Sequence, residues 1–145
     1  MQVQQILKTK GTDGVFTVTP GTLVSDAAKI LSEKRIGTVV ISSDGSAADG
    51  ILSERDIVRE LAEKGATCLN SPVDNYMTRD LQTCTRADLA DDVLARMTEG
   101  RFRHMPVVED GKMVGLITLG DVVKARLAEL AMEKSALEGM ITSQW

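Results

Sequence analysis

Two aspartates, Asp56 and Asp121, follow a hydroxyl residue by three positions in two separate parts of the chain. The first lies in GILSERDIV, residues 50–58, and the second lies in GLITLGDVV, residues 115–123. A carboxylate can accept hydrogen bonds from the two neighbouring hydroxyls of a ribose. A side-chain hydroxyl and free backbone N–H groups can donate hydrogen bonds to a phosphate. Each segment could therefore hold part of a nucleotide.

The same residue types also suit a purely structural role. A Ser, Thr or Asp at the start of a helix caps free N–H groups and offsets the positive end of the helix dipole. A single copy of the motif does not decide between capping and binding. Two copies in matching surroundings favour binding, so the extent of the repetition matters.

The motif belongs to an internal repeat that matches residues 16–64 with residues 82–130. An offset of 66 positions aligns Leu23–Asp26 with Leu89–Asp92, whereas the two motif aspartates are 65 positions apart. The difference of one residue falls after an Asp-Gly turn, where changes in length are tolerated. We call the two copies repeat 1 and repeat 2.

Each copy predicts the element order β-α-β-β-α, with an Asp-Gly hairpin between the second and third strands. The expected strands are residues 16–19, 39–41 and 50–52 in repeat 1, and residues 81–84, 105–108 and 114–117 in repeat 2. Apolar residues at helical spacing mark the first helix of each copy: Leu23, Ala27, Ile30 and Leu31, or Leu89, Val93 and Met97 with Asp88 as the N-cap. The last helices are expected to turn these residues inward: Ile57, Val58 and Leu61, or Val122, Val123, Leu127 and Leu130.

Two helices on one face of a three-stranded sheet leave the other face uncovered, so the halves are expected to pack sheet to sheet. The predicted fold is α+β, with an α/β-like element order. It consists of two β-α-β-β-α repeats related by pseudo-two-fold symmetry, followed by an extended C-terminal helix. The predicted organisation is an N-terminal helical segment (1–15), repeat 1 (16–65), a linker with a short helix at Val73–Met77 (66–81), repeat 2 (82–130) and the helix extension (131–145).

The last helix of repeat 2 lacks the stop signal that Lys64-Gly65 gives repeat 1. Its additional turns carry apolar residues with no counterpart in repeat 1: Ala131, Leu137, Met140, Ile141 and Trp145. These residues could fold back on the N-terminal segment at Val3, Ile6 and Leu7, or they could be buried against a second chain. Both alternatives stay open from the residues alone.

Composition excludes several classes of protein. The chain is 43% hydrophobic and 26% charged, which is typical of a globular protein rather than a disordered one. A net charge of −4 and a pI near 5.0 argue against a general nucleic-acid or membrane-surface binder. Two cysteines, Cys68 and Cys84, are too few for a disulfide framework and indicate reduced thiols. With no long apolar run and no signal-peptide core, the protein is expected to be soluble and cytoplasmic.

The two motifs, each downstream of an aliphatic strand, resemble the cystathionine-β-synthase (CBS) domain, which usually occurs as a tandem pair. The matching pieces are His104–Val108 with Gly115–Asp121, and Gly50–Asp56. The resemblance covers about residues 5–130 and implies a module that senses adenosine-containing ligands in clefts between its halves. The implied ligand is AMP or another adenine nucleotide (ADP, ATP or NAD) or S-adenosylmethionine, with no further cofactor. Such modules usually form homodimers and regulate another protein, here an unknown partner.

The resemblance also assigns a set of binding residues. Asp56 and Asp121 would accept the ribose hydroxyls, and Ser53 and Thr118 would line the ribose or phosphate. Arg55 lies inside the first motif and Gly120 inside the second. The base would be framed by the backbone near Thr17, Val18 and Thr19, near Gly37, Thr38 and Val39, near Thr83, Cys84 and Thr85, and near His104, Met105 and Pro106.

A basic cluster distinguishes the two repeats. Arg103 and His104 stand in repeat 2 where repeat 1 has Gly37 and Thr38, and Arg101 lies close by. A guanidinium suits phosphate through paired hydrogen bonds, so Asp121 is expected to hold the tighter nucleotide. In an alternative arrangement Arg103 serves the nucleotide held by Asp56, and in a third the cluster is only a solvated strand end.

A catalytic function is not predicted. The cluster around His104 has no nucleophile pattern beside it, and no metal-ligand spacing occurs in the chain. The remaining alternative to nucleotide sensing is an assembly module, in which capping alone explains the motif. A retained or added adenine nucleotide would separate these two functions.

Overall fold

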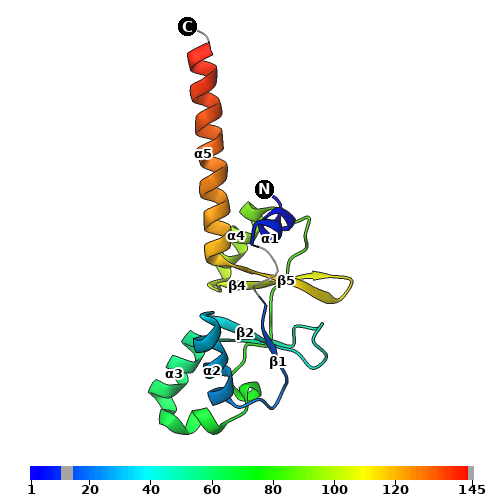
Figure 1. Cartoon of the computed structure of the whole chain (residues 1–145), viewed down its shortest axis with the longest axis vertical. Helices are drawn as coiled ribbons and strands as arrows, with labels where there is room; N and C mark the ends of the chain where they lie inside the picture. Colours follow the sequence, from blue (N-terminus) through cyan, green and yellow to red (C-terminus); the bar gives the residue numbers. More distant parts are fainter. Residues whose placement is uncertain (11–14, 144–145) are drawn as a thin grey trace.

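The structure is a computed structural model that describes residues 1–10 and 15–143. Its two halves each combine a small sheet with helices, and a long C-terminal helix projects beyond one half (Figure 1). Residues 11–14 and Trp145, which belong to the expected terminal segments, lie outside the described residues. Across the described part of the chain, no helix is long and apolar enough to cross a membrane.

Repeat 1 has the expected order of elements. Its sheet runs β1-β2-β3, with β1 parallel to β2 and β2 antiparallel to β3. Helices α2 and α3 lie beside each other in this half (Figure 1). The elements are β1 (Thr17–Val18), α2 (Val24–Lys34), β2 (Thr38–Ile41), β3 (Gly50–Ser53) and α3 (Glu54–Lys64).

Repeat 2 has a two-stranded antiparallel sheet. Its elements are α4 (Ala90–Gly100), β4 (His104–Glu109), β5 (Lys112–Thr118) and α5 (Leu119–Ser143). The expected strand at 81–84 is reduced to one parallel bridge between Cys84 and Val107. Cys84 bonds to Pro106 and Val108 of β4, whereas the Thr85 N–H bonds to the Asp88 carboxylate and the Gln82 side chain accepts from Arg96. Asp88 is therefore not the N-cap of α4, a position that Leu89 takes without a side-chain cap.

The remaining segments connect or cover the repeats. Helix α1 (Val3–Lys10) precedes repeat 1 in sequence but packs against repeat 2. The linker forms two 3-10 helices, η1 (Gly65–Asn70) and η2 (Val73–Asn75), the second within the expected short helix. The hairpin between β4 and β5 turns at Asp110 and Gly111, with φ angles of 52° and 76°. Two successive left-handed residues are what a tight Asp-Gly hairpin turn needs.

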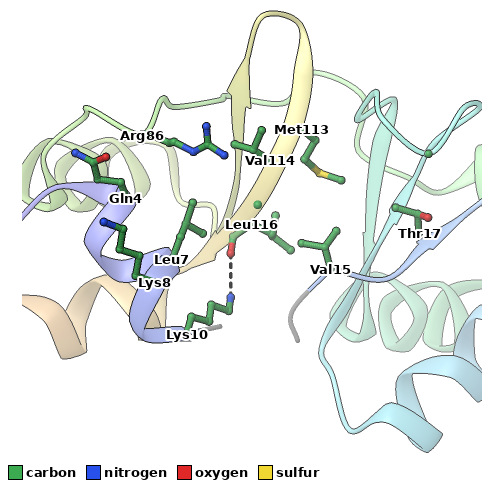
Figure 2. A pocket seen from close by; sticks show the side chains of 12 residues that line it. Gln4, Leu7, Lys8, Lys10, Val15, Thr17, Arg86, Met113, Val114 and Leu116 are labelled. Atoms are coloured by element: carbon green, nitrogen blue, oxygen red, sulfur yellow. Dashed lines mark hydrogen bonds between the residues drawn. The ribbon is translucent and has the colours of Figure 1, made fainter. Parts of the chain in front are cut away.

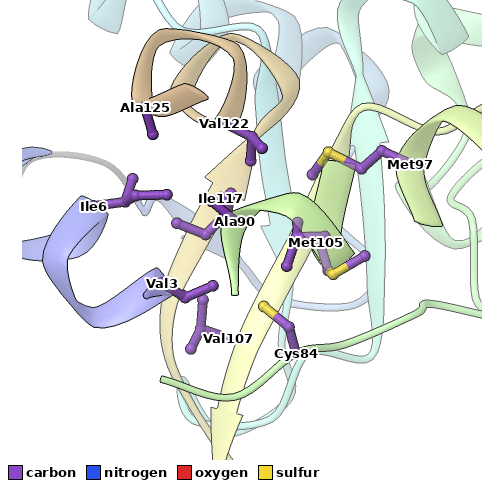
Figure 3. Packing of buried hydrophobic residues seen from close by; sticks show 11 residues of the cluster. Val3, Ile6, Cys84, Ala90, Met97, Met105, Val107, Ile117, Val122 and Ala125 are labelled. Atoms are coloured by element: carbon purple, nitrogen blue, oxygen red, sulfur yellow. The ribbon is translucent and has the colours of Figure 1, made fainter. Parts of the chain in front are cut away.

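Three hydrophobic clusters hold the fold together. The cluster of repeat 1 contains Leu52 and Val73, and the cluster of repeat 2 contains Met97 and Ile117. Val3 and Ile6 of α1 enter the second cluster beside Ala125 of α5 (Figure 3). The third cluster joins the repeats, because it packs β2 and β3 of repeat 1 against β5 of repeat 2 through Val40, Ile51 and Leu116. The halves therefore pack sheet to sheet, as the sequence predicted.

The last helix of each repeat buries less than expected. Ile57 and Val122 are buried, with exposed fractions of 7% and 0%. The other residues that were expected inside are exposed in the described chain: Val58, Leu61, Val123, Leu127 and Leu130. Val58 and Val123 each follow a buried residue by one position and so point about 100° away from it around the helix. Leu61 shares the side of Ile57 but is only partly covered, at 37% exposed. Further along α5, Leu137, Met140 and Ile141 are each 60% exposed, so these turns do not fold back on α1.

Candidate functional site

Both copies of the motif close a reciprocal hydrogen-bond pair at a helix start. The Ser53 hydroxyl accepts from the Asp56 N–H at 3.3 Å, and the Asp56 carboxylate accepts from the Ser53 N–H at 2.8 Å. In repeat 2 the Thr118 hydroxyl accepts from the Asp121 N–H at 3.1 Å, and Asp121 accepts from the Thr118 N–H at 3.0 Å. The capping role is therefore present in both copies. It also fixes each carboxylate at the end of a strand, so capping and binding do not exclude each other.

A cavity of about 450 Å³ opens in front of Asp56, and we call it the Asp56 cavity. Its walls come from the repeat 1 motif, from the end of the linker and from the segment that follows α4. Four arginines and two aspartates line it, which gives it a net positive charge. The lining residues are Ile51, Ser53, Arg55, Asp56, Arg59, Thr78, Asp80, Leu81, Gln82, Gly100, Arg101, Phe102, Arg103 and His104.

Two residues at the end of α4 shape the wall that repeat 2 contributes. Arg101 caps α4 in the left-handed conformation, with φ at 56°, and its backbone N–H bonds to the Met97 carbonyl. Non-glycine residues with positive φ are uncommon and often occur at functional sites. The Phe102 ring lies so close to Gly100 that a Cβ there would be 2.4 Å from the ring. The glycine therefore allows an aromatic face beside the cavity.

Asp121 is engaged by a residue from the other end of the chain. The Lys10 ammonium donates to the Asp121 carboxylate at 2.8 Å and to the Leu116 carbonyl at 2.9 Å. Figure 2 shows Lys10 reaching from the end of α1 to Leu116 on β5. Burial alone raises the pKa of Asp121, but the hydrogen bonds from Lys10 and Thr118 outweigh it and lower that pKa.

A second cavity of about 830 Å³ lies next to Lys10, between α1, β5 and β1 (Figure 2). We call it the Lys10 cavity. Among the described residues, three cations line it, Lys8, Lys10 and Arg86, and no acidic residue does. Asp121 is not one of its lining residues. The two motif aspartates therefore have different surroundings, although their local hydrogen bonds match.

His104 lies between the two motifs. It begins β4, pairs with Thr118 across the sheet, and also lines the Asp56 cavity. Burial lowers its pKa, as do Lys10 and Arg103, while Asp56 and Asp121 act in the opposite direction. The imidazole is therefore held neutral at ordinary pH, where it can both donate and accept a hydrogen bond.

A groove of about 600 Å³, the α5 groove, runs from this point along the base of α5. It is bordered on one side by Glu54 and Arg55 of α3 and on the other by Val123 and Leu127 of α5. Lys124, three residues past Asp121 on α5, also lines it. The groove is thus continuous with the exposed apolar side of α5.

The structure brings together some of the expected binding residues and separates others. Ser53, Arg55, Asp56, Arg103 and His104 meet in the Asp56 cavity. Gly37, Thr118 and Gly120 line the α5 groove, and Thr17 lines the Lys10 cavity. The side chains of a third group are buried in the protein: Val18, Thr38, Val39, Cys84, Met105 and Pro106. The exposed Thr19, Thr83 and Thr85 line none of these three cavities.

Two of the buried residues have clear structural roles. The Thr38 hydroxyl donates to the Leu52 carbonyl at 3.4 Å within the sheet of repeat 1. Burial raises the pKa of the Cys84 thiol to about 11. Cys84 is therefore a protonated core residue, and any contribution of these two positions to binding comes from their backbone.

Sequence reasoning missed several residues around the motifs. The linker end, with Thr78 and Asp80, lines the Asp56 cavity next to Gln82. The internal repeat could have indicated this segment. At the offset of 66, residues 78–82 align with residues 12–16, so both segments lead into a repeat. Lys10 carried no such signal, since its position depends on how α1 packs against repeat 2.

Comparisons with known proteins agree with the repeat. A family model of the CBS domain matches the chain twice, over residues 5–63 and 73–128. A 17.7 kDa protein of Acidianus ambivalens is 33% identical over 127 residues, which cover 87% of this chain and 73% of that protein. The crystal structure of the CBS-domain containing protein ATU1752 from Agrobacterium tumefaciens is 41% identical and has a TM-score of 0.81, with 87% of this chain and 99% of that chain covered.

Some of the similar structures contain ligands. The CBS domain pair of protein MJ0100 was solved in complex with 5′-methylthioadenosine and S-adenosyl-L-methionine. It is 25% identical to this chain, with a TM-score of 0.76, and the match covers 89% of this chain and 98% of that one.

Proposed function

The chain belongs to the CBS-domain family as a tandem pair of repeats, and we propose that it is a non-catalytic regulatory module that binds an adenine nucleotide in the Asp56 cavity. In this proposal Asp56 accepts the ribose hydroxyls and the arginines of the cavity bind phosphate. The ligand state is passed to a regulated partner protein.

The observation that carries the proposal is the composition of the Asp56 cavity. A fixed carboxylate, several guanidinium groups and an apolar wall formed by Ile51, Leu81 and Phe102 line one space of about 450 Å³. This volume lies within the usual range for small-molecule sites, about 300–1,000 Å³. A ribose, a phosphate and a base require these three kinds of surface.

The cavity is also suited to signalling because both repeats build it. Ser53 and Asp56 come from repeat 1, whereas Arg101, Arg103 and His104 come from repeat 2. A ligand held by both sides favours one arrangement of the halves over others, and this differential affinity is what a regulatory ligand needs. This arrangement supports the alternative in which Arg103 serves the nucleotide of Asp56 rather than that of Asp121.

The ligand class follows from the same surfaces. Protein MJ0100 binds two adenosine compounds, and the Asp56 cavity adds arginines that favour a phosphate. We therefore expect AMP or another adenine nucleotide, such as ADP, ATP or NAD, to bind without any further cofactor. The competing proposal, a pure assembly module, is supported by the capping hydrogen bonds at Ser53 and Thr118.

We further propose that the module is a homodimer held partly by α5. Exposed positions recur along the helix at alternating intervals of four and three, which is the spacing of a coiled-coil seam: Val123, Leu127, Leu130, Lys134, Leu137 and Ile141. Val122 and Ala125, which pack against the body, lie on a different side of the helix. The seam is therefore exposed from Val123 to Ile141.

Charge on the borders of this seam favours an antiparallel pair of helices. In a parallel pair, Glu133 of each copy would face Glu138 of the other copy, which is unfavourable. In an antiparallel pair, Lys124 of each copy faces Glu138 of the other. The single like-charge contact is then between Glu133 of one copy and Glu133 of the other. The proposed dimer is therefore antiparallel along α5.

Nucleotide binding is tested by thermal unfolding of the full chain, after native mass spectrometry has shown that it carries no ligand. AMP and NAD at millimolar concentration are expected to raise the midpoint, because a ligand at 100 times its Kd stabilises the folded state by about 2.7 kcal/mol. Inorganic phosphate alone is expected to leave it unchanged. No shift with any of the four nucleotides would favour the assembly module.

A further inference from the structure

Lys10 forms an ion pair with Asp121, the residue that pseudo-two-fold symmetry makes equivalent to Asp56. Its ammonium lies 2.8 Å from the Asp121 carboxylate, and the two side chains are 22% and 24% exposed. A second bond to the Leu116 carbonyl, at 2.9 Å, holds the ammonium from another direction. Ion pairs that are partly shielded from water and have two partners are stronger than exposed ones.

Helix α1 holds Lys10 in this position. Val3 and Ile6 are buried in the core of repeat 2, and the Val3 N–H bonds to the Asp88 carbonyl at 2.9 Å. Leu7 packs so closely on Gly115 that a Cβ there would be 2.7 Å from the leucine side chain. The lysine is therefore attached to an anchored helix, and its contact with Asp121 does not depend on a loose terminus.

The surroundings of Asp56 differ. Its ion pair is with Arg59, three residues further along the same helix, and that side chain is 56% exposed. Arg59 also lines the Asp56 cavity, so it can turn to a phosphate without any helix moving. Lys10, in contrast, donates to two groups of repeat 2 at once, and a ribose could reach Asp121 only after the lysine had left both.

We infer that Lys10 acts as a built-in competitor for the Asp121 position, so that the chain binds one nucleotide, at Asp56, and gains a second site only when Lys10 is removed. A ligand at Asp121 replaces an ion pair, in which both partners are charged, by hydrogen bonds from neutral hydroxyls, in which only the carboxylate is charged. It also leaves the ammonium to find new partners. This inference rests on the proposed function and adds to it the occupancy of the two sites.

Calorimetric titration of the full chain with AMP tests the inference. We expect wild type to bind one AMP per chain and Lys10→Met to bind two, because methionine keeps an unbranched side chain of similar length but removes the charge. Lys8→Met is the matched control, since it removes the same charge from an exposed position of the same helix and should still bind one. Lys10→Gln, which retains a donor for the Leu116 carbonyl, provides a second variant if Lys10→Met unfolds.

A double variant identifies the new site. Adding Asp121→Ala to Lys10→Met should return the stoichiometry to one, whereas adding Asp56→Ala should leave one site that depends on Asp121. A stoichiometry of two AMP per chain in wild type would overturn the inference. So would a stoichiometry of one in wild type and in both Lys10 variants. In either case nucleotide binding itself would stand. If neither wild type nor the Lys10 variants bind AMP, the proposed function fails instead.

Discussion

Arg103 of repeat 2 lines the same cavity as Asp56 of repeat 1, although the sequence associates it with the motif of its own repeat. The segment that follows α4 lines this cavity from the repeat 2 side, and the Arg103 carbonyl accepts from the Leu119 N–H of its own repeat at 2.8 Å. Arg103 and His104 also line the α5 groove, whereas Asp121 lines neither of these two spaces. A nucleotide that contacts both Asp56 and Arg103 must bridge the two repeats.

The first prediction concerns this bridging. Asp56→Ala is expected to abolish AMP binding, because it removes the acceptor of the ribose hydroxyls. Arg103→Ala is expected to weaken AMP by about tenfold or more, since a hydrogen bond to a charged group contributes about 1.5–3 kcal/mol. Adenosine, which lacks the phosphate, should be affected much less. Calorimetry with both ligands measures the difference.

Arg35→Ala is the matched control for Arg103→Ala. Arg35 is an exposed arginine that caps α2 as Arg101 caps α4, and it does not line the Asp56 cavity. Its replacement should leave both affinities unchanged. Equal losses for AMP and adenosine in Arg103→Ala would show that the arginine does not bind phosphate, and the cluster would then be a solvated strand end.

The second prediction concerns the aromatic wall. In Gly100→Ala the new Cβ would meet the Phe102 ring at 2.4 Å, so the ring has to move. We expect weaker binding of adenosine as well as AMP, because the displaced wall faces the base rather than the phosphate. Gly139→Ala is the control, since nothing lies within 4 Å of a Cβ there. Unchanged adenosine affinity in Gly100→Ala would remove Phe102 from the site.

The sequence predicted the architecture because the apolar spacing and the Asp-Gly turns act locally. Residues 39–41 and 50–52 fall in β2 and β3, and the hairpin turn lies at Asp110-Gly111. The sequence-based prediction was wrong where long-range packing determines which residues are buried. The outward turn of Val58 and Leu127 depends on which side of the helix meets the sheet, and periodicity leaves that side undetermined when apolar residues lie on both sides.

The candidate site residues show the same difference between local features, which the sequence predicts, and long-range contacts, which it does not. The hydroxyl and Asp of each motif bond to each other's backbone, as their capping role predicted, since their spacing reflects a local turn. The other residues around the motifs come from remote segments: Arg101 and Thr78 line the same cavity as Asp56, and Lys10 bonds to Asp121. These contacts depend on how distant segments pack, which residue spacing does not show. The two motifs therefore look alike in the sequence, although their surroundings differ in the structure.

The third prediction is a loss of stability in mild acid that depends on His104, the single histidine of the chain. Its folded-state pKa is lowered by burial, Lys10 and Arg103, against the opposing effect of Asp56 and Asp121. Below pH 6.5 the unfolded state therefore binds more protons than the folded state, and the free energy of unfolding falls as the pH falls. The slope is at most about 1.4 kcal/mol per pH unit for one proton.

Urea unfolding between pH 7.5 and 5.5 measures this slope, in a range where carboxylates in general remain ionised. His104→Gln keeps hydrogen-bonding capacity but cannot titrate, so its stability should change less with pH than that of wild type. Equal pH dependence in the two proteins would assign the effect to other groups.

The last prediction concerns the seam of α5. Leu130 and Leu137 are 48% and 60% exposed in the single chain, so changing them should not disturb the folded body. In a dimer paired along the seam they become buried, and a glutamate at either position would place an unpaired charge between the helices. We expect Leu130→Glu and Leu137→Glu to shift light-scattering mass from dimer to monomer at micromolar concentration. Met132→Glu is the matched control, because Met132 is 69% exposed but lies off the seam.

Truncation and charge reversal test the same seam from two sides. A chain that ends at Glu133 lacks Leu137 and Ile141 and should dissociate more readily than the full chain. Lys124→Glu should weaken the antiparallel dimer by opposing Glu138 of the second copy, and adding Glu138→Lys should restore it, which a parallel pair would not reproduce. A monomeric wild-type chain would refute the dimer, and an unchanged dimer after truncation would refute the share of the helix extension in it.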